Sequence, residues 1–235
     1  MTSVRTSASA LARFFRRLGR SSRNDDSPRL STTNCLVADE RQQLIRRILS
    51  SIPNNSILLS GRAGTGKTSI LLYLKGRLMA DEDLALDFYP VYIDLHGVPE
   101  DLLFATVADA VLGQLAFAPP SKVARFGPDY GHRDLARDFR GVIRVLKERG
   151  QKPTRLVLLV DGIDELNHYH PRTTQRVRSL FMASLAERLV MVASAVEIDK
   201  HWDQEGSPWY NFFEEIEISP PAVNRDVRDR MPRDG

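Results

Sequence analysis

Residues 56–68 read Ser-Ile-Leu-Leu-Ser-Gly-Arg-Ala-Gly-Thr-Gly-Lys-Thr, and this stretch decides the fold. Its second part, residues 61–68, matches the pattern G-x-x-x-x-G-K-[ST] of a phosphate-binding loop. A short apolar run precedes the loop, and helical periodicity follows it to about Met79. Because a P-loop needs a strand before it and a helix after it, the sequence predicts a P-loop NTPase.

The loop contains the residue types that a triphosphate requires. Phosphate oxygens need several backbone N–H donors converging on one point, and glycines supply them because they adopt positive φ angles. The N-terminal end of the following helix adds positive potential. We expect Lys67 to contact the β and γ phosphates and the Thr68 hydroxyl to bind Mg²⁺. The expected nucleotide-binding residues are Gly61, Arg62, Ala63, Gly64, Thr65, Gly66, Lys67, Thr68, Ser69 and, further along the chain, Ser194.

A second strand supplies acidic groups. Residues 155–160, RLVLLV, form a continuous apolar run of the kind buried on both faces of a parallel sheet. Asp161 follows at the carboxyl end, where ligands of open α/β sheets bind, and we expect it to hold Mg²⁺ through water. Asp164 and Glu165 come within one turn, and either could orient or deprotonate the attacking water. Asp164 is the preferred base, and the other acid would be a surface or capping residue.

Other polar residues have two interpretations each. Ser194 ends the apolar run 189–194, which we expect beside the two P-loop strands. Its hydroxyl could sense the γ-phosphate or the attacking water, or simply cap the strand. Arg62, Arg133 and Arg137 could meet phosphate from a neighbouring subunit, but surface arginines are common and the sequence selects none of them.

Strand and helix patterns alternate through the chain, which predicts right-handed crossovers and a three-layer α/β/α domain with a mainly parallel five-stranded sheet. The expected strands are 56–60, 88–95, 155–160, 189–194 and 214–218, and the expected helices are 38–51, 67–79, 99–115, 135–149 and 171–188. Residues 121–133 show no clean period and are expected to be loop. The domain plan is a leader and linker over 1–34, an NTPase core over 35–220 and a charged tail over 221–235.

Composition narrows the class of protein. Apolar residues make up 42% and charged residues 27%, as in an ordinary globular domain, and no apolar run approaches the roughly 18 residues of a membrane span. The net charge of +3 depends on residues 1–23, which hold six arginines and no acid. The rest of the chain is slightly acidic overall, so its net charge indicates no nucleic-acid partner. The single cysteine, Cys35, excludes an internal disulfide and fits a reducing, cytoplasmic compartment.

The leader over residues 1–23 lacks the uninterrupted apolar core of a secretory signal. Its arginines, serines and absent acids fit a mitochondrial transit peptide if the source is eukaryotic, which would place the protein in the matrix. We prefer the alternative of a basic, disordered leader.

The run Leu156-Val-Leu-Leu-Val-Asp-Gly-Ile-Asp-Glu-Leu166 resembles the extended Walker B motif of the STAND class, especially NACHT-type NTPases. The resemblance implies a catalytic role for Asp164 or Glu165. Residues 37–44, VADERQQL, are similar to the helix that AAA-related ATPases place before the P-loop, and residues 217–220, EISP, to the strand and turn before their lid. Together these motifs cover about residues 35–220.

The sequence departs from that pattern in two places. The family shows a threonine, serine and arginine run after its fourth strand, whereas residues 193–196, ASAV, contain no arginine. Only about 15 residues follow the expected core, so we expect a lid that is absent or truncated.

The leading hypothesis from sequence is an ATPase that uses ATP and Mg²⁺ in slow hydrolysis as a conformational switch, acting as a homo-oligomer or with a separate effector or sensor protein. A nucleotide-binding interaction module without hydrolysis is the main alternative, and a P-loop kinase is a weaker one because no acceptor site is recognisable. GTP is disfavoured because no N-K-x-D sequence follows.

Overall fold

The computed structural model describes residues 32–114, 129–149, 155–185, 189–199 and 211–220, together with four single residues between 200 and 210. The chain divides into two compact units, Met1–Leu36 and Val37–Gly235, and the fold below is that of the second. Residues 1–31 of the expected leader and linker, and the expected tail over 221–235, lie outside the described residues. The elements in chain order are α2 (Thr32–Ser51), β1 (Ser56–Ser60), α3 (Lys67–Ala80), α4 (Glu82–Asp87), β2 (Phe88–Asp94), η1 (Glu100–Leu102), α5 (Leu103–Gln114), α6 (His132–Arg149), β3 (Arg155–Asp161), η3 (Ile163–His168), α7 (Pro171–Leu185), β4 (Leu189–Ala195) and β5 (Phe213–Glu217).

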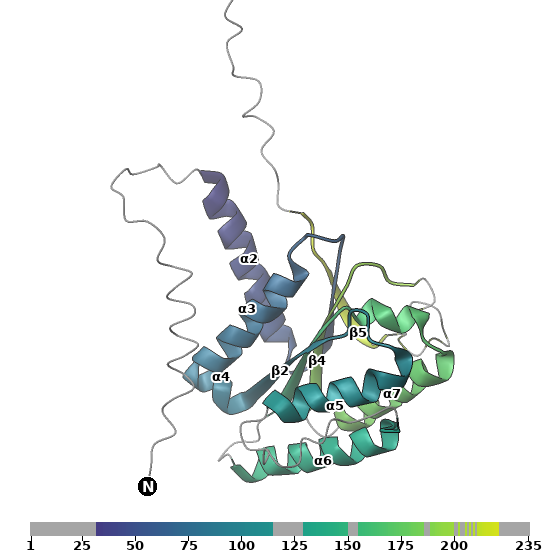
Figure 1. Ribbon diagram of the computed structural model, residues 1–235. Coiled ribbons are helices and arrows are strands. Elements are labelled where there is room, and N and C mark those ends of the chain that lie inside the picture. Colours follow the sequence, from purple (N-terminus) through teal and green to yellow (C-terminus); the bar gives the residue numbers. More distant parts are fainter. Residues whose placement is uncertain are drawn as a thin grey trace, which may run out of the picture. The chain divides into compact units, whose positions relative to one another are not determined.

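The five strands form one sheet in the order β2-β3-β4-β1-β5, and every neighbouring pair is parallel (Figure 1). This confirms the predicted parallel five-stranded sheet. The register places Asp94 beside Asp161 and Leu59 beside Ser194. The carboxyl ends of β1, β2, β3 and β4 therefore meet at one edge, and β4 lies between the two P-loop strands as expected.

Helices cover both faces of the sheet (Figure 1). On one face α2 and α3 bury Ile48, Leu71 and Leu74 completely against β1, β3 and β4. On the other face α5, α6 and α7 build a second core around Leu135 and Phe139. Each fully buried side chain of this size stabilises the fold by about 1.5–3 kcal/mol, so the two apolar layers fix the sheet between them. The three-layer prediction is confirmed.

Several boundaries differ from those predicted. Helix α2 begins at Thr32, inside the expected linker, and α6 begins at His132, inside the expected loop. The short helix α4 was not predicted, because six residues are too few to show a period. Asp81 makes it possible by accepting a hydrogen bond from the Leu84 N–H at 3.3 Å. None of the helices in the described part of the chain has both the length and the apolar character that crossing a membrane requires.

Candidate nucleotide-binding site

The loop between β1 and α3 has the backbone conformation that a phosphate cradle needs. Gly61, Gly64 and Gly66 have φ angles of 146°, 81° and 92°, which side chains rarely adopt. A Cβ atom on Gly61 would also collide with the carbonyl oxygen of Ile218. The Ile218 N–H donates to the Ser60 carbonyl at 2.7 Å, so the segment after β5 packs directly against the start of the loop.

Lys67 lies over this loop. Its ammonium donates to the carbonyl oxygens of Gly61 at 2.5 Å and Arg62 at 2.9 Å. Burial lowers the pKa of Lys67, although the nearby charges of Asp164 and Asp161 act in the opposite direction. The ammonium is thus held at the loop and within the field of both acids, where it can accept an anionic ligand.

Asp161 is 3% exposed and sits at the centre of a group of hydroxyls. Ser194 and Tyr92 donate hydrogen bonds to its two carboxylate oxygens, the second at 2.9 Å, and Thr68 donates a third. Burial acts to raise the pKa of Asp161, but these three hydrogen bonds outweigh it and lower the pKa. The structure therefore brings together Thr68, Asp161 and Ser194, three residues that the sequence placed in one site.

The carboxylates of the two candidate bases, Asp164 and Glu165, form hydrogen bonds with different loops. One Asp164 carboxylate oxygen accepts hydrogen bonds from the backbone N–H groups of Val196 at 3.0 Å and Glu197 at 3.4 Å, after β4. Glu165 accepts from the Gly97 N–H at 2.9 Å, after β2. Of these two candidate bases, only Asp164 is among the charges that act on Lys67. Asp164 is therefore the η3 acid whose charge acts on the P-loop lysine.

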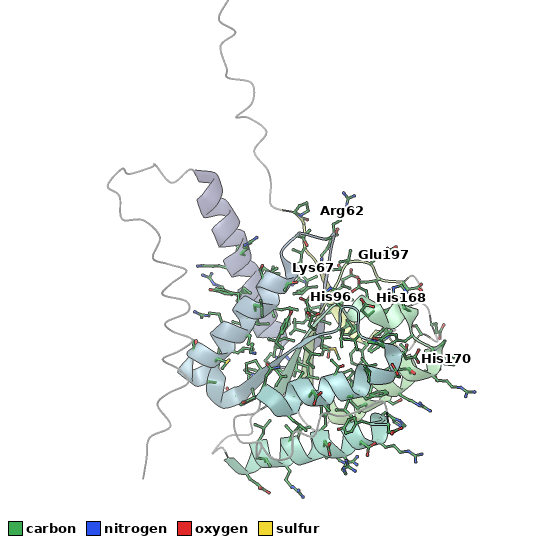
Figure 2. The ribbon with its side chains drawn as sticks, viewed as in Figure 1. Arg62, Lys67, His96, His168, His170 and Glu197 are labelled. Atoms are coloured by element: carbon green, nitrogen blue, oxygen red, sulfur yellow. The ribbon has the colours of Figure 1, made fainter. Side chains whose placement is uncertain are left out.

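The sequence interpretation missed His96, which lies at the same edge of the sheet (Figure 2). Its Nδ1 lies 2.7 Å from Asp94 Oδ1, and its backbone N–H donates to the same oxygen at 3.1 Å. The hydrogen bond to Asp94 raises the pKa of His96 despite partial burial, and the charges of Asp161 and Asp164 act in the same direction. The available sequence signal was Asp94 at the end of β2 with His96 two residues later.

The His96 ring explains why a glycine follows Asp161. Gly162 has a φ of 71°, and a Cβ atom there would come within 2.9 Å of the imidazole. We expect Gly162→Ala to reduce the free energy of unfolding by about 1–2 kcal/mol from backbone strain, plus the cost of displacing the ring. Urea unfolding checks this in a double-mutant cycle with His96→Ala, where the ring term disappears. Equal costs in the two backgrounds would contradict the contact.

A cavity of about 420 Å³ opens beside the loop. Apolar side chains from α2, α3 and the β5 region contribute to its lining, among them Leu44, Ile70, Ile216 and Ile218. Arg41 also lines it, and one guanidinium nitrogen lies 3.5 Å from the position that a Cβ atom at Gly66 would take. The lining also includes Gln43, Arg47 and Glu217, so the cavity offers both apolar and polar contacts to a group bound beside the loop.

Two solved structures have a related fold. The Aeropyrum pernix Orc1 protein, solved in complex with DNA, superposes with a TM-score of 0.54 at 18% identity, over 83% of this chain and 46% of that one. The Walker-type ATPase PABY2304 of Pyrococcus abyssi gives 0.54 at 16% identity, over 76% and 53%. The chain has the three-layer α/β/α fold of a P-loop NTPase, which these two structures share. It spans about half the length of these two structures. No family model and no curated protein matches the sequence.

Proposed function

We propose that the chain binds ATP with Mg²⁺ at this site and hydrolyses it slowly, as a conformational switch of the STAND type. The observation that carries the proposal is the convergence of Lys67, Thr68 and Asp161 at the carboxyl edge of the sheet. Each residue would have a different role: Lys67 would bind phosphate, the Thr68 hydroxyl would bind the metal, and Asp161 would bind metal-bound water.

The residues fit a metal–triphosphate ligand. The hydroxyl of Thr68 already reaches the Asp161 carboxylate, so the two expected Mg²⁺ ligands lie within one hydrogen bond of each other. Bound Mg²⁺ would neutralise charge that develops on the phosphates. Lys67 would exchange its loop carbonyl partners for phosphate oxygens, and the positive φ glycines would direct N–H groups at them.

The cavity beside the loop supports a purine nucleotide. Leu44, Ile70 and Ile218 would offer apolar contacts to the base, and Arg41, which lies near Gly66, would lie close to the phosphates. The sequence carries no N-K-x-D guanine motif, so we propose ATP as the ligand.

The hydrogen bonds of η3 support a switch. Asp164 connects η3 to the loop after β4, and Glu165 connects it to the loop after β2. Further along, the Tyr169 hydroxyl donates to the Val98 carbonyl, and Glu100 accepts from the His170 N–H at 3.0 Å. A change at the γ-phosphate that moves η3 would therefore move both flanking loops, which could present a different surface to a second copy of the chain or to an effector.

Asp161→Asn tests the metal assignment. We expect it to weaken ATP binding in the presence of Mg²⁺ by about 10–100-fold, because it removes charge beside the metal, and to change binding in EDTA little. Fluorescent ATP displacement in the two buffers measures the difference. Tyr92→Phe is the control, because it deletes one hydrogen bond to Asp161 without altering its charge. Equal losses of affinity in the two buffers would refute the role of Asp161.

One observation favours the alternative of a binding module without hydrolysis. One carboxylate oxygen of each η3 acid already accepts backbone hydrogen bonds, which fits a structural role for both acids in holding the neighbouring loops. Turnover of ATP at background level, together with normal Mg²⁺-dependent binding, would select this alternative.

A further inference from the structure

The outer face of α6 is lined with arginine. Its exposed positions are occupied by Arg133, Arg137, Arg140, Arg144 and Glu148. The spacings of four, three and four residues place the four arginines on one side of the helix. The opposite side is apolar and buried against the core, including Leu135 and Phe139.

The cationic surface continues onto α7, which packs against α6. Arg172 and Arg176 are exposed one helical turn apart there. Burial lowers the pKa of His132, and the charges of Arg176 and Arg133 lower it further, so cations of both helices meet near the start of α6. Figure 2 shows nitrogen-tipped side chains extending from both helices away from the sheet. We call Arg133, Arg137, Arg140, Arg144, Arg172 and Arg176 the arginine face.

Little in the described part of the chain neutralises this face. Arg137 pairs with Asp134 at 3.3 Å and with Asp138 at 3.0 Å. None of its other five arginines forms an ion pair with a described residue. Like charges held close together repel one another, and an anionic partner with regularly spaced charges would relieve that repulsion.

We propose that the arginine face binds the phosphate backbone of a nucleic acid, without reading its sequence. The guanidinium group matches phosphate geometry in two parallel hydrogen bonds. Eleven residue steps separate Arg133 from Arg144, about 16 Å of helix, which is long enough to contact more than one phosphate of a strand.

Other anionic partners fit this face less well. Among the α6 residues whose exposure the structure describes, no exposed one has an apolar side chain that could insert into a lipid surface. A convex helix face offers no groove for the side chains of an acidic peptide. The inference is independent of the proposed ATP site, because no residue of the arginine face belongs to it.

The test measures binding of the full chain to a fluorescein-labelled 20-mer, single-stranded and duplex, by anisotropy over 50–200 mM salt. Arg140→Gln/Arg144→Gln removes two charges from the face. Arg46→Gln/Arg77→Gln, on α2 and α3, removes two exposed charges elsewhere. We expect the first variant to lose roughly tenfold in affinity per arginine near 0.1 M salt, and to reduce the salt slope by about 1.4 for single strands or 1.8 for duplex. The second should stay within about twofold of the wild type.

Equal losses of oligonucleotide affinity in the two double variants would overturn the proposal. Binding would then be attributed to cations elsewhere, such as the six arginines of residues 1–23. The proposal would also be overturned if Arg140→Gln/Arg144→Gln bound the oligonucleotide like the wild type but lost binding to polyglutamate or to phosphatidylserine vesicles. Lys67→Ala should bind oligonucleotide like the wild type, so failure of the ATP proposal is distinguishable from failure of this one.

Discussion

Lys67→Ala is expected to abolish measurable ATP binding while the domain stays folded. The Lys67 ammonium donates to the loop carbonyls of Gly61 and Arg62, at the carboxyl edge of the sheet. Lys67 is 6% exposed, so alanine should cost some stability, but the apolar side chains that hold the sheet remain in place. Losing a charge-assisted hydrogen bond to phosphate costs about 1.5–3 kcal/mol, which with the lost long-range attraction amounts to at least about 100-fold in affinity. Equilibrium titration with fluorescent ATP, beside circular dichroism, measures both properties.

Lys75→Ala is the matched control for this variant. Lys75 lies on the same helix, α3, and donates to Gln114 Oε1 at 2.6 Å, away from the loop. Its replacement should leave ATP affinity unchanged, although it can lower stability by removing that bond. Normal ATP affinity in folded Lys67→Ala would refute the P-loop assignment.

The second large effect concerns hydrolysis. Asp164→Asn is expected to slow ATP turnover by about 10²–10⁴-fold with little change in Kd, because a positioned general base contributes that much to the rate and need not hold the triphosphate. Asparagine keeps an oxygen that can accept from the Val196 N–H, so the local structure should persist. Single-turnover hydrolysis and a binding titration separate the two quantities.

Glu165→Gln is the control for Asp164→Asn. Glu165 bonds to Gly97 on the β2 side of η3, and its amide analogue should cost much less in turnover. The reverse ranking would transfer the role of base to Glu165. If wild-type turnover is already at background and neither variant changes it, hydrolysis is excluded and the binding module becomes the better account.

The fold was predictable because its decisive elements carry strong local patterns. The runs at 56–60 and 155–160 are short, continuous and apolar, as buried parallel strands must be, and both appear within one residue of their expected ends. Strand order was inferred only in part, since pairing of β5 with β1 depends on contacts distant in sequence. The helix starts at Thr32 and His132 were missed because hydrophobic periodicity identifies the middle of a helix better than its first residues.

The candidate site was predictable where a motif fixes the spacing of residues along the chain. The P-loop and Asp161 are examples, and the hydrogen bond between Ser194 and Asp161 follows from the adjacent ends of β3 and β4. His96 and Arg41 were missed because each reaches the site from another element, and their roles depend on contacts with Gly162 and Gly66 that tertiary packing creates. Glycine at position 162 had no sequence explanation until the His96 ring was placed beside it.

The most direct measurement is a calorimetric titration of the full chain with ATP in the presence of Mg²⁺. We expect saturable binding of ATP at one site per chain, weaker binding in EDTA, and weaker binding of GTP, because the sequence has no N-K-x-D guanine motif. No saturation at millimolar ATP, with the protein folded by circular dichroism, would contradict the claim that this P-loop binds a magnesium–nucleotide complex.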